Sequence, residues 1–336
     1  MTAPVNLYEL QLRAKLPQYL LQSLDEFEAA TGEVLRRFLA EIEARPLPPL
    51  LYHYTGEGGL RGILGSGTLF CSDVFRQNDK KEIRHGINVA FDELIERGRK
   101  DPDLFRGYAG NIARFRRTHP MENVGNFYIC SLTGQEESER QWRLYGASSR
   151  GFALAFDAMR LEVAFTQANG VPIENNNTFP VTYDRAIAAR LQGEILDLIA
   201  PLLAPLRMGV LAQPSLDAYY NELAVVHLLA IVRFAMFFKA RQWSAEREYR
   251  FQNLFSIDAK PTDVRLRPDP MGGAAIEYRA FDWRSVDPGC LSQIIIGPKA
   301  DQDGGEALAR ELLQLHHPNP ETVKVVQSTV GRHRRG

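Results

Sequence analysis

Two glutamates that lie close together in the sequence, Glu246 and Glu248, have the residue type and the spacing for acid–base chemistry or for stabilising a positive charge. They belong to the segment Trp243-Ser-Ala-Glu-Arg-Glu-Tyr-Arg250, where a strand is predicted to begin. On an extended chain, residues i and i+2 face the same side, so both carboxylates would point into one space. Two close carboxylates do not easily both ionise, which raises one pKa and provides a general acid, a general base or a stabiliser of positive charge.

The same segment also has a purely structural interpretation. It fits a charged, solvated strand in which the two glutamates pair with Arg241, Arg247 or Arg250. An E-x-E pattern is compatible with both interpretations, and the sequence leaves them open.

His53 lies in a second segment of interest, the β-rich stretch Leu51–Thr55. Strand alternation places His53 and Thr55 on one face and Tyr52 and Tyr54 on the other. A neutral imidazole beside a hydroxyl can hydrogen-bond a sugar or a carboxamide in a cleft. The alternative is a core histidine whose hydrogen bonds are satisfied by its neighbours.

A third segment combines a large aromatic side chain with a guanidinium group. Trp142, Arg143 and Tyr145 fall at a predicted turn. Tryptophan and arginine offer a stacking face and a bidentate clamp for an anion, which suits a nucleotide-like ligand. A core tryptophan next to a surface arginine would explain the pattern equally well.

Neither a metal site nor a disulfide framework is expected. The three cysteines, Cys71, Cys130 and Cys290, lie far apart without a C-x-x-C pair, and His85 and His119 lack partners at ligand spacing. The glycine-rich spots do not form a G-x-G-x-x-G or a Walker loop.

The elements that must position these residues are strands interspersed irregularly with helices. This order does not repeat as βαβ units, so we predict an α+β fold with a mixed, largely antiparallel sheet core, helical insertions and an N-terminal helical pair. Strands are predicted at 51–55, 67–72, 126–132, 151–157, 179–183, 249–255, 276–282, 293–297 and 322–328. Helices are predicted at 59–64, 78–99, 185–206, 216–241 and 305–315.

We expect one elaborated domain with additions at both ends. Residues 1–48 form an N-terminal helical extension, in which Thr31 would cap the second of two helices that cover the sheet. Residues 49–330 form the α+β core, with helical insertions near 78–120 and 185–241. Residues 331–336 form a basic tail.

Charge and hydropathy exclude several classes of partner. The 40 Lys and Arg residues nearly cancel the 41 Asp and Glu residues, so no global attraction to nucleic acid or to an anionic membrane is expected. The longest apolar stretch, Leu223–Phe238, is interrupted by His227 and Arg233 and is shorter than the roughly 20 residues that span a bilayer. The N-terminus lacks the pattern of a secretory signal, so a cytoplasmic protein is expected.

Four of these segments, taken in order, resemble an uncharacterised bacterial domain family. Its landmarks are Y-H-Y-T followed by L-x-x-I-L-x-x-G-x-L, then C-S-L-T with W-R-x-Y-G, then E-x-E-[WY]-R, and finally I-I-I-G-P. The resemblance covers about residues 50 to 300. In this chain the landmarks are Tyr52–Thr55 with Leu60–Leu69, Cys130–Thr133 with Trp142–Gly146, Glu246–Arg250 and Ile294–Pro298.

The opening segment is also similar to the first strand of ADP-ribosyltransferases of the H-x-T type, which end their site with a glutamate on a later strand. The resemblance implies that His53 binds a ribose of NAD and that Thr55 supports it. Glu248 would hold the ribose 2′-hydroxyl and stabilise the oxocarbenium ion, because cleavage of the glycosidic bond to nicotinamide builds positive charge on the sugar. Glu246 would orient or deprotonate the acceptor.

The remaining NAD-binding residues implied by this resemblance are Tyr54, Ser72, Trp142, Arg143 and Tyr145. The second strand, around Ser72, lacks a tyrosine motif for stacking on nicotinamide. An aromatic side chain from elsewhere, Phe75, Trp142 or Tyr145, would have to take that role.

The resemblance implies an enzyme that cleaves NAD, used as a substrate, and transfers ADP-ribose to a protein, a nucleic acid or water. Such an enzyme would act in bacterial conflict, as a toxin, or in phage defence. The alternative is a non-catalytic module of the same fold that senses a nucleotide or binds a partner. A hydrolase of other chemistry is a third reading.

Overall fold

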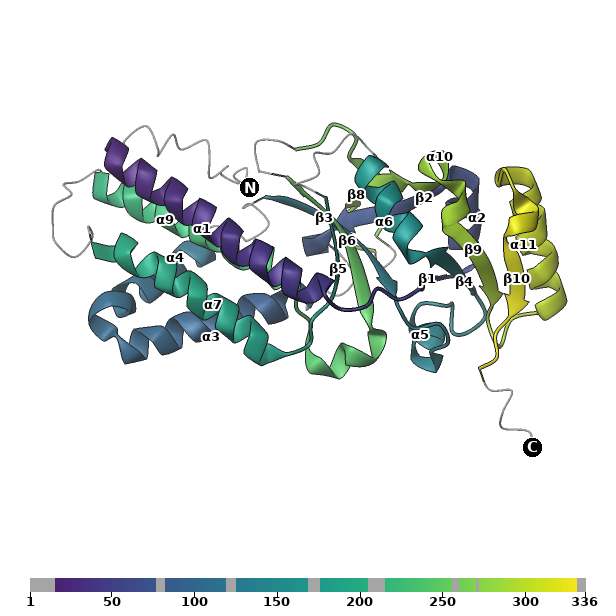
Figure 1. The fold of residues 1–336 in the computed structure, drawn as a ribbon, viewed down its shortest axis with the longest axis horizontal. Coiled ribbons are helices and arrows are strands. Elements are labelled where there is room, and N and C mark those ends of the chain that lie inside the picture. Colours follow the sequence, from purple (N-terminus) through teal and green to yellow (C-terminus); the bar gives the residue numbers. More distant parts are fainter. Residues whose placement is uncertain are drawn as a thin grey trace.

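A computed structural model describes residues 16–76, 82–118, 125–168, 176–204, 215–255, 260–269 and 272–330. Its strands form one ten-stranded sheet, which lies beside a bundle of helices (Figure 1). Strand β10 pairs parallel to β9, and the other strand pairs are antiparallel. The predicted α+β class and the mixed, mostly antiparallel sheet are therefore confirmed.

The sheet runs in the order β10-β9-β4-β1-β3-β2-β8-β7, and β6 and β5 continue it from β3. This order brings the first, third and sixth strands together in the middle, although they are far apart in the chain. The strands are β1 (Leu50–Thr55), β2 (Thr68–Asp73), β3 (Asn126–Thr133), β4 (Phe152–Asp157), β5 (Asn176–Pro180), β6 (Glu248–Phe255), β7 (Arg265–Arg267), β8 (Ile276–Asp282), β9 (Leu291–Ile296) and β10 (Lys324–Gln327).

The sheet splits at β3, and we call this split the fork. One edge of β3 pairs with β6 along its whole length. The other edge is shared, because Tyr52 of β1 pairs with Thr133, whereas Ser72 of β2 pairs with Ile129. Strands β1 and β2 thus diverge, and residues 130–132 of β3 lie between the two pairings. An opening in the sheet follows from this divergence.

Helix α2 (Glu57–Ser66) joins β1 to β2 across the fork. Its first turn is rich in glycine, which lets the helix approach β1 closely. A Cβ atom on Gly59 would lie 1.8 Å from Thr55 Oγ1 and 3.1 Å from Thr55 Cβ, so a side chain has no room there. Glycine at this position therefore sets the distance between the helix and the strand.

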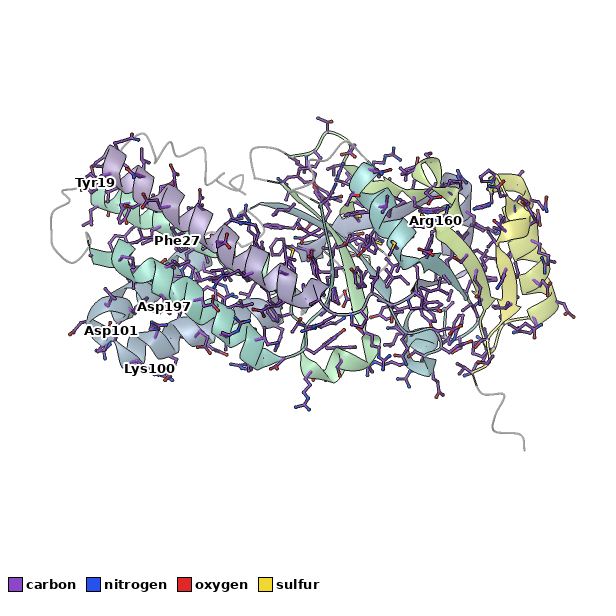
Figure 2. All side chains as sticks on the ribbon, in the orientation of Figure 1. Tyr19, Phe27, Lys100, Asp101, Arg160 and Asp197 are labelled. Atoms are coloured by element: carbon purple, nitrogen blue, oxygen red, sulfur yellow. The ribbon has the colours of Figure 1, made fainter. Side chains whose placement is uncertain are left out.

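The helices that come from three separate parts of the chain pack into one bundle, with an apolar cluster of its own. Helix α9 is buried on nearly every side, as expected for the central helix of a bundle. Figure 2 locates Phe27 on α1 and Asp197 on α7, on the bundle side of the molecule, where Asp197 pairs with Arg97 of α3 at 2.6 Å. The bundle helices are α1 (Gln18–Glu43), α3 (Glu82–Lys100), α4 (Gly107–Thr118), α7 (Arg185–Ile199) and α9 (Ser215–Ala235).

A second apolar cluster packs other helices against the sheet, and in it Trp283 and Phe156 make an edge-to-face contact at 5.4 Å. These helices are α6 (Ala158–Gln167), α10 (Trp283–Val286) and α11 (Gln302–His316). The short helix α5 (Glu139–Leu144) lies between β3 and β4 in the chain.

The predicted N-terminal helical pair is wrong for the described residues, since α1 continues as one helix through the expected break. Thr31, the expected cap, is buried inside the apolar stripe and donates its hydroxyl to the Glu28 carbonyl at 2.9 Å. Helix α1 belongs to the bundle cluster and does not simply cover the sheet, and Phe38 packs edge-on against Phe237 at 5.4 Å. The first part of the expected pair, up to residue 15, and the basic tail at 331–336 lie outside the described residues.

Most of the long apolar stretch, residues 223–235, forms the C-terminal part of α9, and residues 236–238 follow the helix. Within the described ranges, no helix has both the length and the apolarity needed to cross a bilayer.

Candidate functional site

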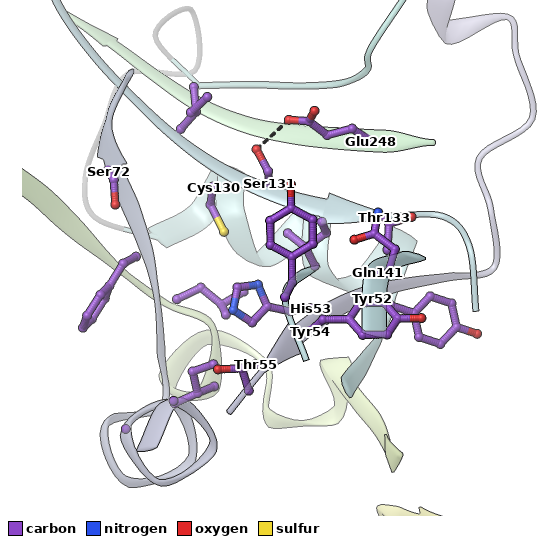
Figure 3. A pocket seen from close by; sticks show the side chains of 18 of the residues that line it. Tyr52, His53, Tyr54, Thr55, Ser72, Cys130, Ser131, Thr133, Gln141 and Glu248 are labelled. Atoms are coloured by element: carbon purple, nitrogen blue, oxygen red, sulfur yellow. Dashed lines mark hydrogen bonds between the residues drawn. The ribbon is translucent and has the colours of Figure 1, made fainter. Parts of the chain in front are cut away.

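A cavity of about 790 Å³ lies at the fork. The diverging strands β1 and β2, the glycine-rich start of α2 and the unpaired edge of β3 form its walls. Its polar lining residues include His53, Thr55, Thr68, Ser72, Ser131, Thr133, Gln141, Tyr145, Lys239, Glu246, Glu248 and Arg267. Figure 3 shows His53 and Thr55 on one strand and Ser72 on another, with the Ser131–Glu248 hydrogen bond above them in this view.

Glu246 and Glu248 both line this cavity, although the extended geometry predicted for them is wrong. Glu246 ends the 3₁₀ helix η9 (Arg241–Glu246), Arg247 has a left-handed backbone with φ of 43°, and Glu248 begins β6. One cation, the ammonium group of Lys239, contacts both carboxylates. Lys239 Nζ lies 2.5 Å from Glu246 Oε2 and 3.0 Å from Glu248 Oε2.

Each oxygen of the Glu248 carboxylate accepts hydrogen bonds. Oε1 accepts from Ser131 Oγ and from Arg250 Nε, both at 2.7 Å, and Oε2 accepts from Lys239. Burial alone would raise the pKa of Glu248. The charges of Arg250 and Lys239 and the hydrogen bonds from Arg250 and Ser131 have the larger, opposite effect, and the pKa falls to about 2. For Glu248 the nearby cations outweigh the effect of crowding, so its pKa is lowered and not raised.

Glu246 is held from three directions, and its side chain is buried. Tyr145 Oη donates to Glu246 Oε1 at 3.3 Å, and Thr133 Oγ1 donates to the Glu246 carbonyl at 2.5 Å. Lys239 also lies over the Trp243 ring, 5.3 Å from its centroid. The carboxylate pair is thus part of a buried ionic cluster at the cavity wall, not of the solvated strand considered from the sequence.

His53 is tied to the same cluster through Ser131. Burial lowers the pKa of His53 to about 4, against a smaller opposite effect from a hydrogen bond with the Ser131 backbone. The imidazole is therefore neutral near pH 7. Because the backbone of Ser131 contacts His53 and its side chain contacts Glu248, one residue of the unpaired β3 edge connects both predicted site residues.

The other predicted site residues divide into two groups. Tyr54, Thr55, Ser72 and Tyr145 line the cavity, and Tyr54 Oη donates to the Glu136 carbonyl at 2.6 Å. Trp142 and Arg143 lie outside this lining.

Trp142 has no exposed surface, because it packs edge-on against Tyr54 at 4.8 Å and donates Nε1 to Glu137 at 3.0 Å. Arg143 is exposed on α5. The core interpretation of the tryptophan, with a surface arginine beside it, thus matches their placement. Phe75 contacts Phe127 at 6.1 Å and also lies outside the lining.

Sequence reasoning missed several lining residues. Lys239 directly follows the longest apolar stretch, and a lysine in that position must find a buried anion, which is the signal that could have identified it. Ser131 lies within the C-S-L-T landmark. Phe70 and Arg267 carried no signal of their own.

A metal would need several ligating side chains together. In the part of the chain that the structure describes, no three His, Cys, Asp or Glu residues form such a group. The polar lining of the cavity consists of hydroxyl groups, carboxylates, an imidazole and an amide, together with the cations Lys239 and Arg267.

A family model described as a protein of unknown function, DUF2971, matches residues 141–251. The matched span is less than half of the chain. It begins at Gln141, next to the cavity, and includes Lys239 and both glutamates, but it leaves out β1 and β2. The expected similarity to an uncharacterised domain family is confirmed over this span. No curated protein and no solved structure matches the chain.

Proposed function

We propose that the protein is an ADP-ribosyltransferase-like enzyme that cleaves the nicotinamide–ribose bond of NAD and passes ADP-ribose to a macromolecule or to water. The observation that carries the proposal is the convergence of His53 and Thr55 of β1 with Glu248 of β6 on one cavity. The cavity volume, about 790 Å³, falls in the range of roughly 300–1,000 Å³ typical of small-molecule sites.

The chemistry requires a fixed negative charge beside the sugar. As the C1′–N bond of NAD breaks, its electron pair leaves with nicotinamide and positive charge develops on the ribose. A Glu248 carboxylate with a pKa of about 2 is ionised throughout the neutral range and is held in place by Ser131 and Arg250. Such a preorganised charge stabilises the developing cation without reorganisation.

His53 and Glu246 have separate parts in the proposal. The neutral imidazole of His53 hydrogen-bonds a ribose hydroxyl, and the Thr55 hydroxyl lies on the same strand face. Glu246 receives the proton of the attacking acceptor as the new bond to C1′ forms. Tyr145, which is 47% exposed and donates to Glu246, lies where an acceptor would approach.

A specific observation favours a second candidate function, that of a non-catalytic nucleotide-binding module. Both Glu248 oxygens already accept hydrogen bonds from cations, and Arg250 has no exposed surface. A carboxylate whose charge is compensated in this way stabilises a cation less, so the cluster would then shape the cavity without performing a reaction.

Nicotinamide release separates the two functions. The full chain is incubated with NAD, with and without cell lysate, and nicotinamide is measured by chromatography, while NAD binding is measured by calorimetry. The enzyme releases nicotinamide, and Glu248→Gln loses this release. Glu306→Gln, which changes an exposed carboxylate of α11 paired with Arg310, is the matched control and keeps it. Binding of NAD without release would favour the binding module. Absence of binding at millimolar NAD would refute the transferase and leave a binding module for another nucleotide.

A further inference from the structure

Arg267 reaches the cavity from the edge of the sheet. It lies on β7, opposite Ile276 of β8, and its guanidinium extends over β8 to β2, where Nη2 donates to Ser72 Oγ at 3.3 Å. Arg267 is one of the residues that line the cavity. An arginine anchored on one side of a cavity in this way is positioned to bind whatever enters it.

The charge of Arg267 is not compensated as the other charges at the site are. Lys239 pairs with both glutamates and Arg250 pairs with Glu248, but no described carboxylate forms an ion pair with Arg267. Its Nε is buried and, within the described ranges, has no hydrogen-bond partner. A guanidinium presents five N–H donors, so most of its donors remain for a ligand. A buried donor favours a ligand that supplies the missing acceptor.

An aromatic surface lies beside this guanidinium. Phe70 is two residues from Ser72 on β2, so the two side chains share a face of the sheet. The Phe70 ring is 45% exposed, lines the cavity, and lies 4.1 Å from the Tyr278 ring of the neighbouring strand β8. Together they offer a planar ring a surface on which to stack.

We infer that Arg267 and Ser72 form the anion-binding subsite of the cavity, which takes a phosphate group of a nucleotide whose ring stacks on Phe70. The inference rests on the proposed function only in that it assigns a nucleotide to this cavity. It adds the ligand class, a phosphorylated nucleoside, and the residue that distinguishes it from an unphosphorylated one. Arginine suits this role because its planar fork binds phosphate oxygens in pairs.

The experiment compares phosphorylated and unphosphorylated ligands by calorimetry on the full chain. ADP-ribose and AMP are tested against adenosine, and inorganic pyrophosphate is used as a competitor to separate the phosphate contribution from that of the ring. Wild-type protein binds ADP-ribose about tenfold or more tightly than adenosine, and this preference weakens as salt is raised. Equal affinities for AMP and ADP-ribose would assign the subsite to a single phosphate group.

Arg267→Gln removes the preference for phosphorylated ligands and leaves adenosine binding unchanged, whereas Arg267→Lys keeps part of the preference. Arg265→Gln is the matched control, since Arg265 lies on the same strand but is exposed outside the cavity lining. An unchanged melting temperature for each variant shows that the edge strand is intact.

Three outcomes overturn the inference. They are a wild-type protein that does not prefer ADP-ribose to adenosine, an Arg267→Gln variant that keeps the preference, and an equal loss in Arg265→Gln. Failure of the proposed function is a different result: the preference holds and depends on Arg267, but NAD yields no nicotinamide.

Discussion

Glu248 and Arg250, two residues apart on β6, bind each other in the interior of the protein, with Arg250 Nε 2.7 Å from Glu248 Oε1. Side chains at i and i+2 of a strand share a face, so the strand itself brings the charges together. Arg250 also donates to the Met236 carbonyl, which fixes the guanidinium behind the carboxylate. The pair therefore positions Glu248 as well as neutralising it.

Removal of the cation between the two glutamates should strongly destabilise the fold. Lys239→Met leaves two buried carboxylates with Arg250 alone, and breaking a buried ion cluster costs about 3–5 kcal/mol. Lys260→Met is the control, because the Lys260–Glu277 pair is half exposed and should contribute about 1 kcal/mol or less. Urea unfolding measures both values. Equal losses in the two variants would show that the cluster is not a stabilising unit.

Acid should destabilise the protein in two separate pH windows. The pKa of Glu248 is lowered from 4.5 to about 2 by folding, so its contribution is complete above pH 4.5 and is lost as the pH falls towards 2. The pKa of His53 is lowered from 6.5 to about 4, so its contribution is complete above pH 6.5 and is lost between pH 6.5 and 4. Each shift corresponds to stability on the order of 3 kcal/mol.

Unfolding free energies measured across pH 2–8 test this assignment. His53→Gln should reduce the slope of the curve between pH 6.5 and 4, and Glu248→Gln should reduce it below pH 4.5. His227, which burial holds neutral with a pKa of about 3, contributes in the upper window as well, so His227→Gln is the parallel variant. A wild-type curve that is level between pH 6.5 and 4 would contradict the neutral state of both histidines in the folded protein.

Two adjacent glycines allow the shape of the cavity to be tested. Gly59→Ala places a Cβ atom 1.8 Å from Thr55 Oγ1, which must displace Thr55 or the first turn of α2. Gly58→Ala meets nothing within 4 Å, and alanine at a helical position adds up to about 1 kcal/mol relative to glycine. We expect ligand binding to be at least tenfold weaker in Gly59→Ala and to change less in Gly58→Ala, which also lines the cavity but meets no atom, measured by calorimetry. If both variants bind normally, Thr55 and α2 do not define the ligand-binding space.

Substitution of Glu248 and of Glu246 should have different effects on the kinetics. Glu248→Gln removes a charge that matters in the transition state, so it should bind NAD about as well as wild type and release little nicotinamide. Glu246→Gln should lose transfer to a macromolecule more than hydrolysis by water, because an acceptor needs its proton removed. Chromatography of nicotinamide and labelled ADP-ribose measures both activities. Undiminished release by Glu248→Gln would end the assignment of that residue.

Helix α1 should be essential to the bundle. A chain without residues 1–44 exposes the apolar faces of α7 and α9 that α1 covers, and also the Phe237 and Phe238 rings just after α9, which contact Phe38. We expect lower solubility and a lower melting temperature, measured by centrifugation and circular dichroism. A truncated chain as soluble and as stable as the full chain would show that the bundle is complete without α1.

The sequence predicted the strands well because their signal is local. Segments 51–55, 126–132, 151–157 and 276–282 each alternate or are uniformly apolar between turn residues, and each became a strand within one or two residues. The strand expected at 179–183 instead spans Asn176–Pro180, because its limits are set by pairing with β6. Pairing is a tertiary property that no local pattern contains.

The candidate site was predictable only in part, for the same reason. The sequence identified His53 and the glutamate pair, which line the cavity. It also suggested Trp142 and Arg143, which lie outside the cavity lining. Lys239 approaches Glu248 from the end of an apolar stretch, and Arg267 from the far edge of the sheet. Both contacts depend on how distant segments pack together, and no local sequence pattern contains that information.

The bundle has a consequence for the synthesis of the chain. Helix α1 ends at residue 43, but the helices that cover its apolar stripe begin at residue 185 and end at residue 235. At translation rates of about 5–20 residues per second, the stripe waits on the order of 10 to 40 s for its partners. During that interval the nascent chain carries Leu24, Phe27 and Phe38 without the helices that bury them in the folded protein.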